Sequence, residues 1–324
     1  MPDTAPEAVA SRGPDALVAA ARRGDRRPLA KLLSLVERGG APAHEVGRLV
    51  YPLGGGAYTV GITGAPGAGK STLTNGLVGL IRSGEESVAV LAVDPTSPFS
   101  GGAILGDRVR MSDHALDEGV FIRSMATRGH LGGLALATPE AVRVLDAVGI
   151  PWILVETVGV GQVEVEVAAS ADTTIVVVNP GWGDSVQANK AGLLEVADLF
   201  VINKADRAGA AESRRDLDGM LELGADRGWR PPIVCTTAIT GDGLDELWAA
   251  VADHRTHLEA EGRLEVKRNA RVRDELQLIV AQRLRSRADE LLGAADRERL
   301  EAAVLARHLD PYSAADEVLR AASD

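Results

Sequence analysis

The sequence predicts an α/β fold in which a doubly wound, mostly parallel sheet carries helical extensions at both ends. Short runs of Val, Ile and Leu alternate with longer segments of helical periodicity along the middle of the chain. Most runs are apolar at consecutive positions, which is typical of parallel strands that helices cover on both faces. An open sheet of this kind binds its ligands beyond the carboxyl ends of the strands.

The strands are expected where apolar runs are bounded by turn-forming residues. They are predicted at Thr59–Thr63, Ser87–Val93, Val120–Ser124, Trp152–Glu156, Thr173–Val178, Leu199–Asn203 and Ile233–Thr237. Between them, the periodicity predicts helices at Gly69–Arg82, Pro139–Val148, Gln162–Ala169, Val186–Val196, Ala210–Arg227 and Leu244–Arg255.

The segments outside the sheet are predicted to be helical. Helices are expected from Ala16 to Arg23, across Leu29–Val36 with Pro28 in the first turn, over His44–Val50, from His254 to about Arg287, over Asp296–Arg307 and over Ser313–Ala322. The predicted organisation is a disordered N-terminus (1–13), an N-terminal helical segment (14–52), an α/β domain (53–255) and a C-terminal helical segment (256–324).

The C-terminal segment has a narrow apolar stripe made of Leu276, Ile279, Val280 and Leu284. Such a stripe outside a sheet can be buried against a second subunit, which would make this a dimerisation segment. Packing back onto the same domain remains the alternative.

Composition narrows the class of partner. The 324 residues include 35 Lys and Arg against 46 Asp and Glu, so the net charge is −11, which argues against nucleic acid and anionic membranes as main partners. The N-terminus lacks the apolar core of a signal peptide, and no stretch reaches the roughly 18 apolar residues of a membrane span. A cytoplasmic protein is expected. Cys235 is the single cysteine, which excludes an internal disulfide and a zinc or nickel cluster of cysteines; it is predicted to be a buried strand residue rather than a reactive thiol.

The segment GAPGAGKS at Gly64–Ser71 matches the phosphate-binding formula G-x-x-x-x-G-K-[ST], with a predicted strand before it and a helix after it. The glycines allow successive N–H groups to wrap a phosphate, Lys70 would reach the β- and γ-phosphates, and the Ser71 hydroxyl would bind Mg²⁺. The predicted fold is therefore that of a P-loop NTPase. The residues expected to hold the phosphates are Gly64, Ala65, Pro66, Gly67, Ala68, Gly69, Lys70, Ser71 and Thr72. A glycine-rich turn that binds nothing is the alternative.

Asn203-Lys204-Ala205-Asp206 follows a predicted strand and has the form N-K-x-D, by which GTPases bind guanine. The Asp206 carboxylate can accept hydrogen bonds from guanine N1–H and the 2-amino group, whereas adenine offers neither donor. Thr237 and Ala238, after the next strand, are placed to close over the base edge. These residues favour GTP over ATP.

Three acidic residues are candidates for the metal. Asp94 and Glu156 end predicted strands, and Asp107 lies between two of them. Since Mg²⁺ keeps several waters, Ser71 with one or two of these carboxylates would suffice. Gly159 is placed to offer its N–H to the γ-phosphate, which makes Glu156–Gln162 a predicted switch loop.

Several longer motifs resemble those of the MeaB/ArgK family of GTPases: GITGAPGAGKST, VDPTSPFSGGAILGDRVRM, FIRSMATRGHLGGLA, ETVGVGQVEVEVA and NPGWGDSVQANKAGLLEVADLFVINKADR. The resemblance runs from about Asp15 to the C-terminus. It implies a homodimer formed through the C-terminal helices. It also implies that the protein is a chaperone of an adenosylcobalamin-dependent mutase, most of all methylmalonyl-CoA mutase. The chaperone would gate the loading of the cofactor and protect the mutase. The resemblance also implies that Asp94, Asp107 and Glu156 line the Mg²⁺ site. The segment Gly181–Gly192 would be an extra switch, with Asp184, Gln187 and Lys190 coupling the nucleotide to the mutase.

The predicted catalytic set is Lys70, Glu156, Gly159 and Lys190. The residue directly after Gly159 is Val160 rather than glutamine, and Gln162 lies two positions beyond Val160, so slow intrinsic hydrolysis is expected until a partner completes the site. Lys190 could supply the missing cation, or it could be a solvated surface lysine. Rival functions are an ATP-dependent kinase associated with amino-acid transport, a metal-insertion GTPase and a pure interaction protein.

Two further groups of side chains are more typical of structural or surface residues. Phosphates or an acidic mutase surface could be bound by a set of arginines, but single residues of this kind are more often solvated or salt-bridged; the set is Arg108, Arg110, Arg123 and Arg128. His254 and His257 are expected to form a surface pair, because no third or fourth metal ligand stands near them.

Overall fold

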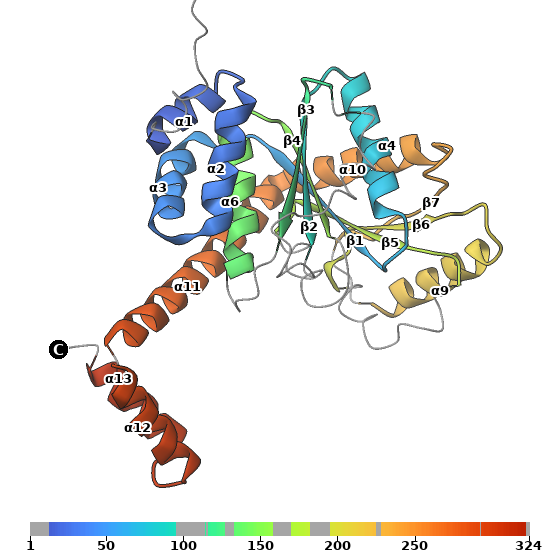
Figure 1. The fold of residues 1–324 in the computed structure, drawn as a ribbon. Coiled ribbons are helices and arrows are strands. Elements are labelled where there is room, and N and C mark those ends of the chain that lie inside the picture. The colour runs from blue at the N-terminus through green and yellow to red at the C-terminus, as the bar shows by residue number, and fades with distance from the viewer. Residues whose placement is uncertain are drawn as a thin grey trace, which may run out of the picture. The chain divides into compact units, whose positions relative to one another are not determined.

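The computed structural model confirms the α/β fold and describes residues 13–94, 114, 116–126, 133–157, 170–181, 195–224, 228–291 and 293–321. Its centre is a seven-stranded sheet of order β3-β2-β4-β1-β5-β6-β7, in which every pair of neighbours is parallel (Figure 1). The first strand, β1, lies in the middle of the sheet; β2, β3 and β4 lie on one side of it, and β5, β6 and β7 lie on the other. The carboxyl ends of the strands therefore gather at one edge of the sheet, where ligands of such folds bind.

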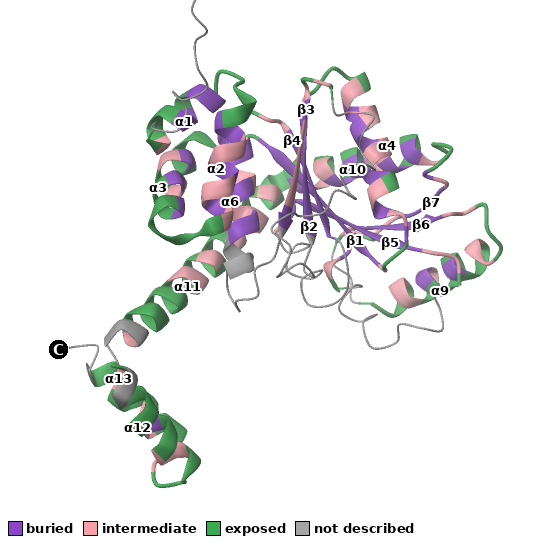
Figure 2. Cartoon of the chain, viewed as in Figure 1, coloured by how far each residue is buried: buried purple, intermediate pink, exposed green. Residues whose placement is uncertain are grey.

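All the predicted strands are confirmed, with ends that differ by a residue or two. They are β1 (Tyr58–Gly64), β2 (Val88–Asp94), β3 (Val120–Ala126), β4 (Trp152–Thr157), β5 (Thr173–Val178), β6 (Leu199–Asn203) and β7 (Ile233–Thr236). The central strands are buried along their whole length because helices cover both faces, which explains their continuous apolar runs (Figure 2). Cys235 lies on the edge strand β7 and is only partly buried, so the prediction of a buried cysteine is half right.

Helices cover the two faces of the sheet as a doubly wound fold requires. On one face lie α4 (Lys70–Ser83) and α10 (Leu244–Glu259), which share an apolar cluster with Val60, Ile62 and Leu154. On the other face lie α6 (Gly133–Ala147), packed against β2 and β4, and α9 (Ala210–Leu223), packed against β5 and β6. The predicted helix at 162–169 lies outside the described residues, as does the one at 186–196 except for its last two residues, which are helical.

Helix α6 begins six residues before the predicted start at Pro139, so that prediction is wrong. Proline favours the first turn of a helix, but inside a helix it removes one hydrogen bond without always ending it. The preceding Leu134-Ala135-Leu136-Ala137 consists of strong helix formers, which extend the helix through the proline.

The N-terminal helices α1 (Pro14–Ala21), α2 (Arg26–Arg38) and α3 (Gly40–Val50), followed by a short 3₁₀ turn at Tyr51–Leu53, pack on the α6 face of the sheet (Figure 1). Helix α3 starts four residues earlier than predicted, directly after Gly39, whose φ of 71° ends α2. Arg123 of β3 donates hydrogen bonds to Glu37 (2.7 Å) and to Ser34 of α2. Arg123 is therefore a structural residue, as predicted.

The predicted continuous helix from His254 to Arg287 is wrong, because the chain breaks at the 3₁₀ turn Ala260–Gly262, where Glu261 has φ 57°. Positive φ values at Glu261 and Gly262 end α10 and allow α11 (Arg263–Leu291) to begin on a new axis. Helices α12 (Ala294–Leu305) and α13 (Pro311–Ala321) follow.

The contacts divide the chain into two compact units, Met1–Arg268 and Asn269–Asp324. Within the second unit, α12 and α13 pack together, Leu300 is buried, and Arg299 lies 3.8 Å from Glu317. Leu276, Val280 and Leu284 of the predicted stripe are exposed. None of the helices in the described part of the chain is long and apolar enough to cross a membrane.

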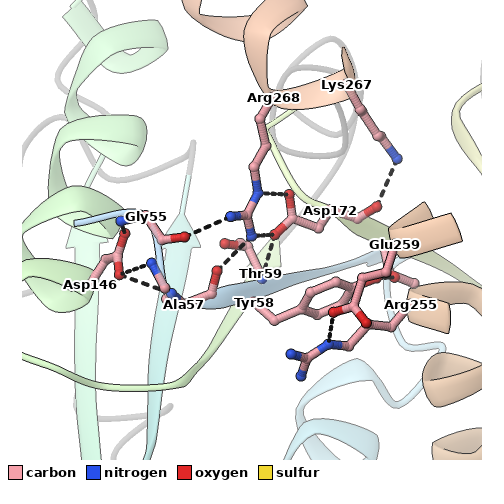
Figure 3. Close-up of polar contacts among 12 residues, drawn as sticks. Gly55, Ala57, Tyr58, Thr59, Asp146, Asp172, Arg255, Glu259, Lys267 and Arg268 are labelled. Carbon is pink, nitrogen blue, oxygen red and sulfur yellow. Dashed lines mark hydrogen bonds and ion pairs between the residues drawn. The ribbon is translucent and has the colours of Figure 1, made fainter. Parts of the chain in front are cut away.

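A group of charged residues holds the amino-terminal end of β1 in place, and we call Asp146, Asp172 and Arg268 the β1 clasp (Figure 3). Asp146 accepts hydrogen bonds from the N–H groups of Gly55, Gly56 and Ala57. Arg268 donates to Gly55 O, to Ala57 O (2.7 Å) and to both carboxylate oxygens of Asp172. Asp172 in turn accepts the N–H of Thr59. The clasp satisfies both the donors and the acceptors of a glycine-rich segment that would otherwise be costly to order.

His254 is fully buried beside this clasp, so the prediction that it forms a surface pair with His257 is wrong. Its Nδ1 lies 2.8 Å from Thr173 Oγ1, which also bonds the hydroxyl of Tyr58. Its Nε2 lies 3.4 Å from Asp198, whose carboxylate also binds Lys267. Burial lowers the pKa of His254 to about 4, because the charged ring would lose its hydration. The positive charge of Lys267 lowers the pKa further, and the attraction of Asp198 for the charged ring offsets only part of this.

The stability of the protein is expected to fall in mild acid for this reason. Unfolding releases His254 to its ordinary pKa of about 6.5, so between pH 6.5 and 4 the unfolded chain binds a proton that the folded chain does not. This proton should lower the free energy of unfolding by about 2 kcal/mol between pH 7 and pH 5. Denaturant unfolding at the two pH values measures the change. His254→Gln should remove the part of the pH dependence that is due to His254, whereas His44→Gln, at an exposed position, should not. Equal pH dependence of unfolding in the two variants would contradict the assignment of this effect to His254.

Candidate nucleotide-binding site

The predicted phosphate loop lies between β1 and α4, at the carboxyl edge of the sheet. Gly64 has φ 133°, and a side chain there would overlap the carbonyl oxygen of Val177 on the neighbouring strand β5. The 6%-exposed Lys70 donates from Nζ to Gly64 O (2.7 Å) and to Ala65 O (3.1 Å). The loop therefore keeps the lysine ammonium against its own backbone, where it would meet a bound phosphate.

Asn203 joins this loop to the predicted base-binding segments, which are far from it in the sequence. Its Nδ2 donates to Ala68 O (2.8 Å), and its Oδ1 accepts from Thr236 Oγ1 and from the N–H of Ala238 (both 3.1 Å). Gly69 must be glycine because a Cβ would overlap the Asn203 amide. One buried amide thus ties together the ends of β1, β6 and β7.

Lys204 and Asp206 complete the segment after β6. Lys204 has a φ of 60°, and its Nζ donates to Gly67 O (2.6 Å), so its side chain lies along the phosphate loop. Asp206 is exposed, and the turn that holds it is fixed by the bond from Ala205 N–H to Thr236 O (3.0 Å). An exposed carboxylate beside Lys204, with Thr237 and Ala238 nearby in the next turn, is able to receive the hydrogen-bonding edge of a purine.

The predicted metal ligands are brought together in part. The Ser71 hydroxyl donates to Glu156 Oε1 (2.5 Å), and Glu156 is 2% exposed at the end of β4. A hydroxyl and a carboxylate oxygen in contact are the hard ligands that suit Mg²⁺, so the residues present fit that ion. Asp94 ends β2, next to β4, but its side chain and all of Asp107 lie outside the described residues. Within the described ranges, no group of three His, Cys, Asp or Glu side chains could hold a metal ion.

Gly159 and the coupling residues Asp184, Gln187 and Lys190 lie outside the described residues.

Sequence reasoning missed the buried pair of Thr63 and Thr157, whose hydroxyl oxygens are 3.1 Å apart between the phosphate loop and Glu156. Their positions directly beside Gly64 and Glu156 were the available signal.

Comparison with known proteins gives the family. Residues 29–291 match the family model described as "Methylmalonyl Co-A mutase-associated GTPase MeaB". A candidate GTPase of Pyrococcus abyssi (strain GE5 / Orsay) is 50% identical over 310 residues, which cover 94% of this chain and 96% of that protein. GTPase ArgK of Escherichia coli (strain K12) is 42% identical over 255 residues, which cover 75% and 76% of the two chains. A crystal structure described as a LAO/AO transport system kinase superposes with a TM-score of 0.74 at 29% identity, covering 98% of this chain and 99% of that one.

Asn203 joins the predicted phosphate loop to the predicted base-binding segment, and the family match extends over all of them. The chain belongs to the MeaB family of methylmalonyl-CoA mutase-associated GTPases, and its reaction is the hydrolysis of GTP.

Proposed function

We propose that this GTPase depends on Mg²⁺ and acts as a chaperone that gates cofactor loading and protection of an adenosylcobalamin-dependent acyl-CoA mutase, with methylmalonyl-CoA mutase as the first candidate. The observation that carries the nucleotide part is the Asn203 bridge between the phosphate loop and the base segment. The family description supports the mutase part.

In this proposal the chain's own residues position the triphosphate. N–H groups of the phosphate loop and Lys70 bind the β- and γ-phosphates, and Gly159 contributes its N–H to the γ-phosphate. Ser71 and Glu156, with Asp94 and Asp107, hold the metal ion, which would supply positive charge beside the phosphates. Slow hydrolysis without the mutase is expected because phosphoryl transfer needs further positive charge at the γ-phosphate, which Lys190 brings when the mutase binds.

We further propose a homodimer formed through the C-terminal helices. Its support is the row of exposed apolar side chains on α11, Leu276, Val280 and Leu284, one helical turn apart. The cytoplasmic location stays a prediction.

Base selection is tested by Asp206→Ala. The substitution removes the acceptor for guanine N1–H and the 2-amino group, so GTP affinity should fall about 10- to 100-fold while ATP affinity stays within about twofold. Competition of GTP and ATP for a fluorescent nucleotide measures both, with Asp216→Ala on α9 as a control of equal charge. An unchanged preference for GTP would show that Asp206 does not select the base, whereas a wild-type protein that binds ATP as tightly as GTP would favour the kinase alternative.

The mutase part is tested by Lys190→Ala. GTP binding should be retained, and the stimulation of hydrolysis by added methylmalonyl-CoA mutase should be lost, since the variant lacks the cation that the partner would bring to the phosphates. Lys190→Arg, which keeps the charge, should retain part of the stimulation. Full stimulation of the alanine variant would show that the predicted switch acts through another residue.

A further inference from the structure

The carboxyl ends of β1 and β4 are held together by two buried side chains where their backbone pairing stops. The register between these strands runs from Tyr58 opposite Trp152 to Ile62 opposite Glu156 and goes no further. One residue beyond, Thr157 Oγ1 lies 3.1 Å from Thr63 Oγ1 and 3.5 Å from Ile62 O. Thr63 and Thr157 are 0% and 1% exposed, so this bond is closed to solvent.

Residues 156 and 157 are fixed from opposite faces of the sheet. Side chains alternate along a strand, so Glu156 points to the α4 face, as Leu154 does, and Thr157 points to the α6 face, as Val155 does. Glu156 is bonded to Ser71 at the start of α4, and Thr157 is bonded to Thr63 at the end of β1. Neither residue can turn about the strand axis without breaking one of the two bonds.

The hydroxyl pair is not needed to fill space. Valine has nearly the shape of threonine and is cheaper to bury, because an apolar side chain loses no hydrogen bond to water. The strand positions on the same face of β4 are apolar, namely Ile153 and Val155. Two buried hydroxyls that bond each other therefore fix how the ends of β1 and β4 lie relative to one another, which apolar side chains of the same size would not do.

From this geometry we propose that Thr157 and Thr63 are positioning residues for GTP hydrolysis. Their bond sets the distance between the phosphate loop, which begins at Gly64, and the Glu156 carboxylate. A ligand carboxylate displaced by a fraction of an ångström loses much of its effect on a transition state, whereas ground-state binding by the loop amides is less sensitive. This inference rests on the proposed roles of Ser71 and Glu156 in the metal site.

The test compares Thr157→Val, Thr63→Val, the double variant and Thr157→Ser in the full-length protein. Thr157→Val should lower kcat about three- to tenfold, raise the Mg²⁺ concentration needed for half-maximal rate, and leave the dissociation constant for GDP within about twofold. Thr157→Ser keeps the hydroxyl and should recover most of kcat. The double variant should be no slower than Thr157→Val, because both substitutions break the same bond.

The controls separate this inference from the site that it depends on. Thr59→Val, at the other end of β1, should leave kcat unchanged. A kcat of Thr157→Val within twofold of the wild type, a Thr157→Ser variant as slow as the valine variant, or multiplying effects in the double variant would each overturn the positioning role. The metal site itself fails instead if Glu156→Gln and Ser71→Ala leave Mg²⁺-dependent hydrolysis unchanged.

Discussion

Replacing Arg268 with alanine is expected to lower the free energy of unfolding by about 3–5 kcal/mol. The Asp172 carboxylate is 1% exposed and receives two hydrogen bonds from the Arg268 guanidinium, at 2.6 and 3.1 Å. Without that guanidinium, the buried Asp172 carboxylate keeps the N–H of Thr59 but loses its charged partner, and the carbonyl groups of Gly55 and Ala57 lose the hydrogen bonds from Arg268. Removing one partner of a buried ion pair lowers stability by more than the intact pair contributes, because the charge that remains is still buried away from water and no longer has its partner.

Denaturant unfolding of full-length Arg268→Ala measures this loss. Arg263→Ala is a matched control on the same helix, because Arg263 is 44% exposed and pairs with the 77%-exposed Glu261. An exposed pair of this kind contributes about 0–1 kcal/mol. Similar losses in the two variants would show that the β1 clasp is no stronger than a surface ion pair.

Replacing Gly64 with alanine is expected to cost about 4 kcal/mol or more, or to prevent the protein from folding. The added Cβ would overlap the backbone carbonyl of Val177, which is paired with β1 and cannot move without opening the sheet. A φ of 133° adds strain that a residue with a side chain rarely accepts. Lower solubility and a lower thermal midpoint are the expected observations.

Gly67→Ala is the matched control in the same loop. Its φ of 72° is also unfavourable for alanine, but a Cβ there would meet nothing within 4 Å. A loss of about 1–2 kcal/mol is therefore expected, with a folded protein that can be tested for nucleotide binding. If Gly64→Ala were no less stable than Gly67→Ala, the close approach of β1 and β5 at the phosphate loop would be wrong.

The sheet and the glycine-rich loop after β1 were predictable because their signals are local. Each central strand is a continuous apolar run, and Gly64, Gly67 and Gly69 all have positive φ angles, which glycine adopts without strain. Helix ends were less predictable where two local rules conflict. At Pro139, a preference for the first turn competed with the helix-forming residues before it, and the longer helix formed.

The burial of His254 could not be predicted, because its spacing from His257 is equally compatible with a solvent face. What places it inside is the approach of β5 and β6, which bring Thr173 and Asp198 to its two ring nitrogens. At the break between α10 and α11, Gly262 is a local signal for a helix end, but nothing local predicts the positive φ of Glu261. Its positive φ is stable because the helix after it binds Asp172 and Asp198 through Arg268 and Lys267.

The amino-acid order alone determined the class of fold and the family, and it also predicts a phosphate loop and a guanine-binding segment, since each of these is encoded by residues close together in the chain. The β1 clasp, the Asn203 bridge and the Thr63–Thr157 pair depend on the folded chain. Their partners are separated by 33 residues, between Asn203 and Thr236, to 213 residues, between Gly55 and Arg268, and they become neighbours only when distant parts of the chain align. Periodicity shows which residues are buried, but which buried polar groups meet is decided by strand order and register.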